Sequence, residues 1–291
     1  MTARLDHMLP IISVDELRER IGAPDLLLID ARFSLADPSA GRRDYHESHL
    51  PGAVYLHLDE DLSAPPSEHG GRHPLPAPEH AAHTFGVAGI GPETHVVAYD
   101  YGDGMTAGRV WWLLRWLGHE RVQVLDGGLA AWRARGAPES SEVPSPQAQR
   151  FEAEPDPSLV VDNRWLREHL HDPEVTLIDA RAPERFRGEE EPIDRLAGHV
   201  PGAINLPYAD NLEDGRFKSP AALRARFADV AASSTLVVYC GSGVSAAHHS
   251  IALELAGLRG ARLYAGSWSD WVSYDDAPVA TGSAEPEDDS H

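Results

Sequence analysis

The sequence predicts an α/β fold made of two tandem domains, each a mostly parallel sheet flanked by helices on both faces. Two observations lead to this prediction: the chain repeats itself, and short apolar strands alternate with helices within each copy. The runs "LLLID" at 26–30 and "TLVVY" at 235–239 are almost continuously apolar. Strands of this kind are typical of parallel sheets, because helices cover both of their faces.

Four landmarks recur in the same order in the two halves of the chain. "LLLIDAR" and "HLPGAVYL" return as "VTLIDAR" and "HVPGAINL", and "HVVAYD" and "VQVLDGGLAAW" return as "TLVVYC" and "ARLYAGSWSDW". Each landmark occupies the same place in the predicted element order, so duplication explains the match better than coincidence. The predicted parts are a domain at 1–143, a Pro-, Ser- and Glu-rich linker at 144–157, a second domain at 158–280 and an acidic tail at 281–291.

The elements of each copy follow from periodicity and turn signals. The first copy begins with a helix over 12–21, where Ser13 is a candidate N-cap and Glu16 completes a capping box. Further elements of this copy are strands at 26–30, 53–56, 95–100 and 122–127 and a helix at 107–118. The second copy repeats them as a helix at 161–170, strands at 175–179, 203–206, 235–239 and 261–264, and a helix at 245–257.

Composition excludes several classes of partner. The formal charge of −21 over 291 residues argues against nucleic acid or an anionic membrane as the main partner. The single cysteine excludes an intrachain disulfide and a thiolate-rich zinc site, and the 16 histidines show no converging ligand set, so we expect no metal and no other cofactor. Without a secretory signal or a membrane-spanning stretch, a reduced, cytoplasmic location is expected.

The one cysteine, Cys240, directly follows a predicted buried strand, at the end where parallel sheets bind ligands. A loop of small residues separates it from a helix: Gly241, Ser242, Gly243, Val244 and Ser245. Backbone amides of such a loop, together with the start of the helix, favour a thiolate over a thiol and make a nucleophile. The first copy has Asp100 in this place, and an aspartate is a poor replacement for a core cysteine.

Other interpretations of this cysteine are weaker. A lone cysteine is often simply buried, but the exchange for Asp100 in the first copy argues against that. A cysteine-dependent phosphatase needs an arginine six residues after the cysteine to hold phosphate oxygens, and Ala246 stands there. A papain-type protease is disfavoured because its local cysteine signature is missing.

Several motifs resemble the rhodanese family, specifically its two-domain sulfurtransferases. They are "YHESHLPGAVYL", "GRVWWLLRWLGHERVQVLDGGLAAW", the loop "CGSGVS", with Ser245 where threonine is usual, and "ARLYAGSWSDW", with Asp270 where glutamate is commoner. The resemblance implies tandem rhodanese-like domains, the first one inactive. It also implies transfer of a sulfane sulfur from 3-mercaptopyruvate or thiosulfate, through a Cys240 persulfide, to cyanide, a thiol or thioredoxin. The alternative from another class is a non-enzymatic persulfide carrier or binding module.

The resemblance also assigns further site residues. Arg185 matches the arginine that binds the anionic group of the small sulfur donor, alongside the loop from Gly241 to Ser245. A second such arginine is common, but Ile193 stands in its place, and Arg195 could replace it only if the loop shifts. The neutral loop favours mercaptopyruvate, whereas the missing arginine speaks against it, so the donor stays open.

A Ser–His–Asp set proposed for part of the family corresponds here to Ser242, His73 and Asp59. It would move a proton during carbon–sulfur cleavage. The alternative is that Ser242 only shapes the loop and His73 only contacts the other domain.

Matching residues in the two copies suggest structural roles. His49 and His199 occupy equivalent turns, and Asp30 and Asp179 end equivalent strands, where hydrogen bonds to turn amides are expected. The tryptophans of the helix at 107–118 fall at helical spacing and predict core or domain-interface packing. Two domains packed together suggest a monomer.

Overall fold

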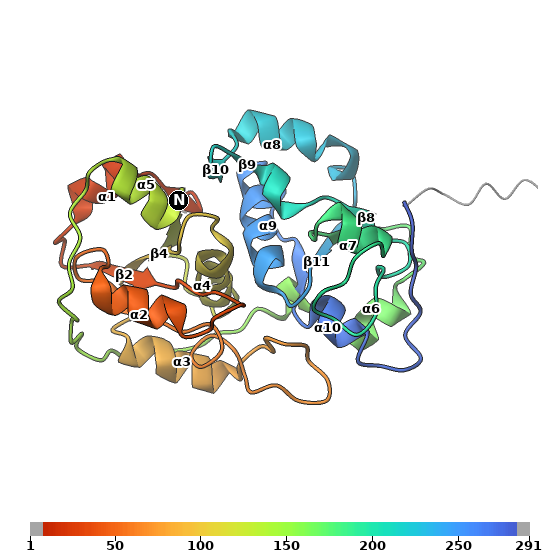
Figure 1. Ribbon diagram of the computed structural model, residues 1–291, viewed down its shortest axis with the longest axis horizontal. Helices are drawn as coiled ribbons and strands as arrows, with labels where there is room; N and C mark the ends of the chain where they lie inside the picture. The colour runs from red at the N-terminus through yellow and green to blue at the C-terminus, as the bar shows by residue number, and fades with distance from the viewer. Residues whose placement is uncertain (1–7, 284–291) are drawn as a thin grey trace, which may run out of the picture.

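The computed structural model describes residues 8–283, which form two lobes lying side by side (Figure 1). The first lobe, red to yellow, and the second, green to blue, each contain a five-stranded sheet with helices on both faces. Every strand pair within these two sheets is parallel. The predicted architecture of two tandem α/β domains is therefore confirmed.

In the first domain the strand order is β1-β5-β4-β2-β3. Its elements are β1 (Ile11–Ile12), α1 (Val14–Arg20), β2 (Leu26–Asp30), α2 (Ala40–Glu47), β3 (Val54–Tyr55), α3 (Pro78–Val87), β4 (His95–Tyr99), α4 (Met105–Trp116), β5 (Val122–Leu125) and α5 (Gly128–Ala134). The predicted capping box is confirmed, because Glu16 N–H donates to the Ser13 hydroxyl and the Glu16 carboxylate accepts from Ser13 N–H.

The second domain has the equivalent order β6-β12-β11-β7-β8. Its elements are η1 (Pro157–Leu159), β6 (Val160–Val161), α6 (Asn163–Glu168), β7 (Val175–Asp179), α7 (Pro183–Arg187), β8 (Ile204–Asn205), η2 (Tyr208–Asn211), β9 (Leu212–Glu213), β10 (Arg216–Phe217), α8 (Pro220–Arg226), η3 (Ala228–Val230), β11 (Thr235–Tyr239), α9 (Val244–Leu255), β12 (Arg262–Tyr264) and α10 (Ser267–Trp271). Both copies thus place the strand before Asp100 or Cys240 in the middle of the sheet.

Sequence periodicity missed the shorter elements, among them α2, α7, α8 and the β9–β10 hairpin. The hairpin had a usable signal, because Asp214 and Gly215 at its turn form the Asp-Gly pair that favours positive φ, and both adopt it. This hairpin reaches the first domain, where Phe217 N–H donates to the Asp126 carboxylate at 2.9 Å.

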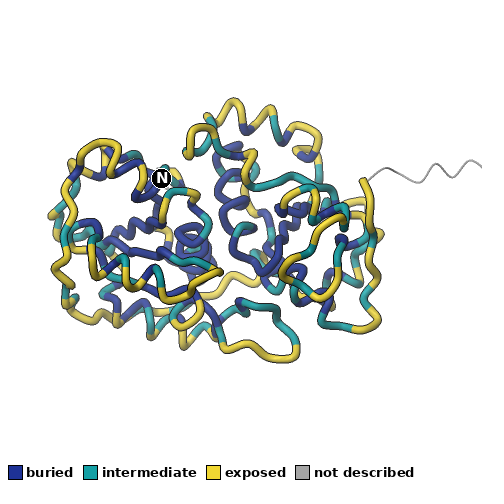
Figure 2. Tube along the Cα trace, in the orientation of Figure 1, coloured by how far each residue is buried: buried dark blue, intermediate teal, exposed yellow. Residues whose placement is uncertain are grey.

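The domains pack mainly through α4 and α9, which face each other at the centre of the molecule and are almost wholly buried (Figure 2). Gly108 permits this approach, since a Cβ there would lie 3.0 Å from the backbone nitrogen of His248. Trp111, Trp112 and Trp116 are buried along α4, which confirms the packing role predicted for them.

A second inter-domain connection is the segment 63–74, called the strap from here on. It leaves the first domain and lies against α10 and the residues that follow it. Gly70 N–H donates to the Asp270 carboxylate at 2.7 Å, and Arg72 N–H donates to the Ser269 hydroxyl at 3.1 Å. The strap therefore brings Arg72 and His73 of the first domain to the second.

Residues 141–156 contain neither helix nor strand and follow the surface of the first domain. Gln149 N–H donates to the Gly86 carbonyl and Glu154 N–H to the Leu117 carbonyl, at 2.9 and 3.0 Å. The acidic tail predicted at 281–291 lies outside the described residues from 284 onward. Across residues 8–283, none of the helices combines the length and the apolar character needed to span a bilayer.

The domain interface predicts a specific acid sensitivity. Burial lowers the pKa of His248 on α9 to about 4, whereas a histidine in an unfolded chain titrates near ~6.5. Between these values the unfolded state binds more protons, so stability falls as the pH decreases below about 6.5, by up to ~1.4 kcal/mol per pH unit from this residue. Urea unfolding of the His248→Gln variant should show a shallower loss of stability from pH 6.5 to 4.5. The control His80→Gln removes an exposed imidazole from α3. If the stability of the His248→Gln variant fell with decreasing pH as steeply as that of the unmodified chain, the prediction would be contradicted.

Candidate active site

Cys240 lies where β11 ends, between the ends of β7 and β12. Its side chain is 2% exposed, and Gly243 N–H donates a hydrogen bond to Sγ at 3.1 Å. Cys240 N–H donates to the Ser267 hydroxyl at 3.1 Å, which fixes the backbone of the cysteine against α10. The sulfur is therefore held at the start of α9, where the amide and the helix terminus both favour negative charge.

The loop depends on one glycine conformation. Gly243 is the N-cap of α9 and has φ of +79°, and a Cβ there would lie 2.3 Å from the Ala265 carbonyl oxygen. A side chain is thus excluded both by the left-handed backbone and by the neighbouring carbonyl. The Gly243 N–H reaches the sulfur because of this turn.

The first copy forms a similar turn, one residue longer, around Asp100. Gly104 is the N-cap of α4 with φ of +72°, and its N–H donates to Asp100 Oδ1 at 3.0 Å, as Gly243 does to sulfur. Gly102 N–H and Ala107 N–H also donate to this carboxylate, at 3.0 and 3.1 Å. Burial, followed by the neighbouring Asp103, raises the pKa of Asp100 to about 7. An aspartate side chain thus takes the place of the cysteine in a loop that keeps its amide donors.

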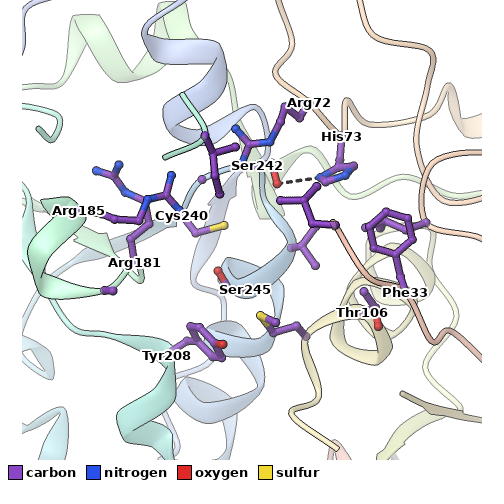
Figure 3. A pocket seen from close by; sticks show the side chains of 17 residues that line it. Phe33, Arg72, His73, Thr106, Arg181, Arg185, Tyr208, Cys240, Ser242 and Ser245 are labelled. Carbon is purple, nitrogen blue, oxygen red and sulfur yellow. Dashed lines mark hydrogen bonds between the residues drawn. The ribbon is translucent and has the colours of Figure 1, made fainter. Parts of the chain in front are cut away.

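Cys240 opens into a cavity of about 320 Å³ between the two domains (Figure 3). Its residues are Phe33, Leu35, Leu58, Arg72, His73, Met105, Thr106, Arg181, Ala182, Arg185, Ile193, Tyr208, Cys240, Gly241, Ser242, Val244 and Ser245. Both domains supply apolar lining, and three arginines lie near the sulfur. The cavity suits a small molecule with an anionic group and a short carbon chain.

The arginines of the cavity are tied to carboxylates. Arg181 pairs with Asp179 at 2.7 Å and with Glu191 at 3.3 Å, and Arg185 pairs with Glu191 at 2.7 Å. Although burial opposes it, hydrogen bonding from Arg185 leaves the pKa of Glu191 below its usual value. The guanidinium groups of this cluster therefore have fixed positions, and the paired carboxylates neutralise most of their positive charge.

Asp194 joins the strap to this cluster. Its carboxylate accepts from Arg185 at 3.0 Å through Oδ2 and from Arg72 through Oδ1. Burial raises the pKa of Asp194, against the attraction of Arg72. One carboxylate thus holds an arginine from each domain.

Ser242, His73 and Asp59, which come from both domains, lie in one row. The Ser242 hydroxyl is 2.8 Å from His73 Nδ1, and His73 Nε2 is 3.2 Å from Asp59 Oδ1 (Figure 3 shows the first contact). Burial, with Arg109 and Arg72 nearby, lowers the pKa of His73 to about 3, so the ring is neutral at physiological pH. With its proton on Nε2, facing the carboxylate, Nδ1 accepts from the serine.

Arg109 of α4 positions His73 from behind. It is fully buried, and its Nη2 donates to the carbonyl oxygen of His73 at 3.0 Å. Burial lowers the pKa of Arg109 to about 10, with Cys240 acting in the opposite direction, so the guanidinium remains charged at neutral pH. The packing of α4 thus holds a buried cation behind the loop.

The structure places the two remaining arginine candidates differently. Arg185 lies on α7 and lines the cavity, as expected of a donor-binding residue. Ile193 also lines it and supplies no charge, whereas Arg195 pairs with the exposed Asp275 at 2.9 Å. Arg195 lines a neighbouring groove rather than the cavity, so the loop shift that it needs has not occurred.

Sequence reasoning missed Arg72 and Arg181. Arg181 had a sequence signal, because it repeats Arg32 directly after the equivalent strand. That repeat gave no reason to place Arg181 near Cys240, since Arg181 lines the cavity and Arg32 does not. Arg72 had none beyond its position before His73. Its role depends on the strap reaching the other domain, which no local pattern encodes.

The matching histidines and aspartates have structural partners. His49 contacts the Tyr45 carbonyl at 2.6 Å and His199 the Phe186 carbonyl at 2.7 Å, each through Nδ1. Asp30 and Asp179 accept from the amides two residues later, as predicted. Within residues 8–283, no three His, Cys, Asp or Glu side chains gather closely enough to hold a metal ion.

Replacing Gly243 by alanine should disable the loop. Strain at positive φ costs roughly 1–3 kcal/mol, and contact with the Ala265 carbonyl adds to it. We expect a lower free energy of unfolding in urea and slower alkylation of Cys240 by iodoacetamide. Gly257→Ala is the matched control, since Gly257 has φ of +90° and a Cβ there would meet no neighbouring atom within 4 Å. Equal losses in both variants would show that the carbonyl contact does not matter.

Comparisons with known proteins agree with this geometry. The rhodanese-like domain family matches residues 13–135 and 162–274. A Pseudomonas aeruginosa protein named "Probable 3-mercaptopyruvate sulfurtransferase" is 48% identical over 278 residues, covering 94% of this chain and 98% of that protein. The thiosulfate sulfurtransferase of Cricetulus griseus is 36% identical over 278 residues, covering 92% and 91%.

Among solved structures, the crystal structure of SseA from Escherichia coli, described as a 3-mercaptopyruvate sulfotransferase with the rhodanese fold, superposes with a TM-score of 0.77. It is 33% identical, and the match covers 90% of this chain and all of that one. The chain therefore belongs to the rhodanese family, as a two-domain enzyme of the sulfurtransferase class.

Proposed function

We propose that the enzyme transfers the sulfur of 3-mercaptopyruvate to a thiophilic acceptor through a persulfide on Cys240. The observation that carries this proposal is the position of Sγ, 3.1 Å from the Gly243 amide nitrogen in a small cavity lined by arginines. An amide-held thiolate beside an anion-binding surface is what attack on an anionic sulfur donor requires.

The first step balances without an added oxidant or reductant. The Cys240 thiolate attacks the donor sulfur, the bond between that sulfur and the donor's C3 breaks, and its electron pair leaves as the enolate of pyruvate. The proton of the donor thiol ends on carbon, so the products are pyruvate and an anionic persulfide. Attack by cyanide or a thiolate on the outer sulfur then regenerates the Cys240 thiolate.

The first domain supports the persulfide assignment. An aspartate carboxylate and a cysteine persulfide both carry their negative charge two bonds beyond Cβ. In the first copy, the Ala107 amide donates to Asp100 Oδ2 at 3.1 Å, and the Thr106 hydroxyl is 3.4 Å from the same oxygen. Counting from the N-caps Gly104 and Gly243, these donors correspond to the amide of Ala246 and the hydroxyl of Ser245. We infer that this amide and hydroxyl hold the outer sulfur.

The row of Ser242, His73 and Asp59 supplies a path for the proton. His73 is neutral, its Nδ1 can accept from Ser242, and its Nε2 faces Asp59. Ser242 lies in the loop beside Cys240, where the enolate forms. The neutral His73 can therefore take up the proton of the donor thiol through the Ser242 hydroxyl, with Asp59 balancing the imidazolium, and return it through the same hydroxyl to the departing carbon.

The charge of the cavity favours a donor with one negative charge. Its three arginines, at 72, 181 and 185, are matched by the carboxylates of Asp179, Glu191 and Asp194. A monoanionic carboxylate needs only directed guanidinium hydrogen bonds, whereas dianionic thiosulfate needs surplus positive charge. We therefore place mercaptopyruvate first, although relatives carry both donor names.

The acceptor has room to approach. A groove of about 650 Å³, which shares Arg72, His73 and Ile193 with the cavity, lies next to it. We propose that cyanide, a small thiol or the thiol of a protein such as thioredoxin reaches the persulfide from this side. A reducing, cytoplasmic setting would keep both the acceptor and the lone cysteine reduced.

The test is to incubate the protein with 3-mercaptopyruvate, remove the donor, and measure the mass of the chain. We expect one added sulfur, lost on addition of cyanide with formation of thiocyanate. Because Cys240 is the only cysteine, Cys240→Ser is a clean control and should show neither signal. An active serine variant would refute the assigned nucleophile, and loading without turnover would instead favour a persulfide carrier.

The proton path predicts a difference between donors. His73→Gln and Ser242→Ala should lower kcat with 3-mercaptopyruvate by roughly 10²- to 10⁴-fold, the usual range for general acid–base catalysis. Cleavage of thiosulfate releases sulfite, which needs no proton, so kcat with that donor should change much less. Steady-state rates with both donors and saturating cyanide measure this. Equal losses with both donors would mean that these residues only shape the loop.

A further inference from the structure

Two guanidinium groups from different domains meet above the residue after the nucleophile. A Cβ at Gly241 would lie 2.9 Å from Arg72 Nη2 and 3.5 Å from Arg185 Nη1. Both side chains line the cavity into which Cys240 opens (Figure 3). The missing side chain of Gly241 therefore lets both guanidinium groups approach the loop.

Asp194 sets the spacing of these two groups. Its two carboxylate oxygens accept from one arginine each, Oδ1 from Arg72 and Oδ2 from Arg185. Asp194 N–H in turn donates to the Glu191 carboxylate at 3.0 Å, which fixes the backbone of Asp194. The arrangement holds two planar donor groups side by side before any ligand arrives, which lowers the cost of ordering them.

Arg72 has donor capacity left over. Its Nη1 is used by Asp194, whereas its Nε is buried and has no hydrogen-bond partner among the described residues. The side chain is 26% exposed and borders both the cavity and the adjoining groove. A plain inter-domain ion pair would not need to place Nη2 against the catalytic loop.

We propose that Arg72 is a donor-binding residue, supplied by the first domain, which grips the carboxylate of the sulfur donor together with Arg185. This inference rests on the proposed function, since it concerns the donor of the same site. It also explains how the cavity binds a carboxylate although Ile193 contributes no charge. The site is then complete only when the strap is docked on the second domain.

The chemistry of the donor fits this position. In 3-mercaptopyruvate the sulfur-bearing carbon is separated from the carboxylate by the keto carbon alone. A carboxylate held beside Gly241 therefore leaves the sulfur within a short distance of the preceding residue, Cys240. Two guanidinium forks also fix the plane of the carboxylate, which a single arginine or a lysine ammonium does less well.

The test measures binding without sulfur transfer. In a Cys240→Ser background, 3-mercaptopyruvate is titrated by calorimetry into the chain with Arg72→Gln, Arg72→Lys or Arg195→Gln. The last is the matched control, because it removes the same charge at the adjoining groove, where Arg195 pairs with exposed Asp275. We expect Arg72→Gln to weaken binding roughly 10- to 100-fold, as for the loss of charge-assisted hydrogen bonds, Arg72→Lys to weaken it less, and Arg195→Gln to leave it unchanged.

The outcomes separate this inference from the proposed function. Unchanged affinity in Arg72→Gln, an equal loss in Arg195→Gln, or no measurable binding in the Cys240→Ser parent would each overturn the role of Arg72. A loss confined to Arg72→Gln supports it even if the unmodified chain transfers no sulfur, in which case only the proposed reaction fails. With Cys240 present, Arg72→Gln should raise KM for 3-mercaptopyruvate far more than it lowers kcat, which a misfolded loop would not do.

Discussion

The close packing of α4 against α9 is the constraint on which the site depends. It brings Gly108 against α9, where a Cβ would lie only 3.0 Å from the backbone nitrogen of His248. The packing buries Arg109 behind the catalytic loop, and Arg109 in turn holds the carbonyl of His73. Cys240 comes from one domain, while His73 and part of the cavity wall come from the other. The site is therefore formed by the docking of the two domains, and the first domain is part of it.

Duplication left two versions of one anion-holding loop. In both, a left-handed glycine at the helix start turns its amide toward the residue that follows the central strand. Asp100 fills the first loop with its own carboxylate, which satisfies the amides and leaves no room for chemistry. Cys240 is one atom shorter in reach, so under the proposed function its loop keeps donors for a second sulfur. The two loops thus differ in the side chain that their amide donors receive.

Sequence reasoning reached the parts of the structure that are local or repeated. The buried strands, the capping box at Ser13 and Glu16, and the duplication follow from short-range patterns, and so does the loop around Cys240. The β9–β10 hairpin was missed because its strands are only two residues long, although the Asp214–Gly215 pair is a typical hairpin-turn signal. Arg72 could not be found in this way. Its position depends on an ion pair with Asp194, far away in the chain, and neither residue stands out among the 46 acidic and 25 basic side chains.

Binding of the proposed anionic donor by an acidic protein has to rely on groups close to the donor. The net charge of −21 repels an anionic donor at long range, but mobile ions screen that field beyond about 8–10 Å at physiological salt. Within the cavity, the carboxylates of Asp179, Glu191 and Asp194 neutralise the arginines without blocking every N–H. Attraction there comes from the direction of the remaining N–H groups rather than from surplus charge. Under the proposed function, such a site favours a donor whose carboxylate matches two fixed guanidinium planes, and a more highly charged donor gains no further advantage.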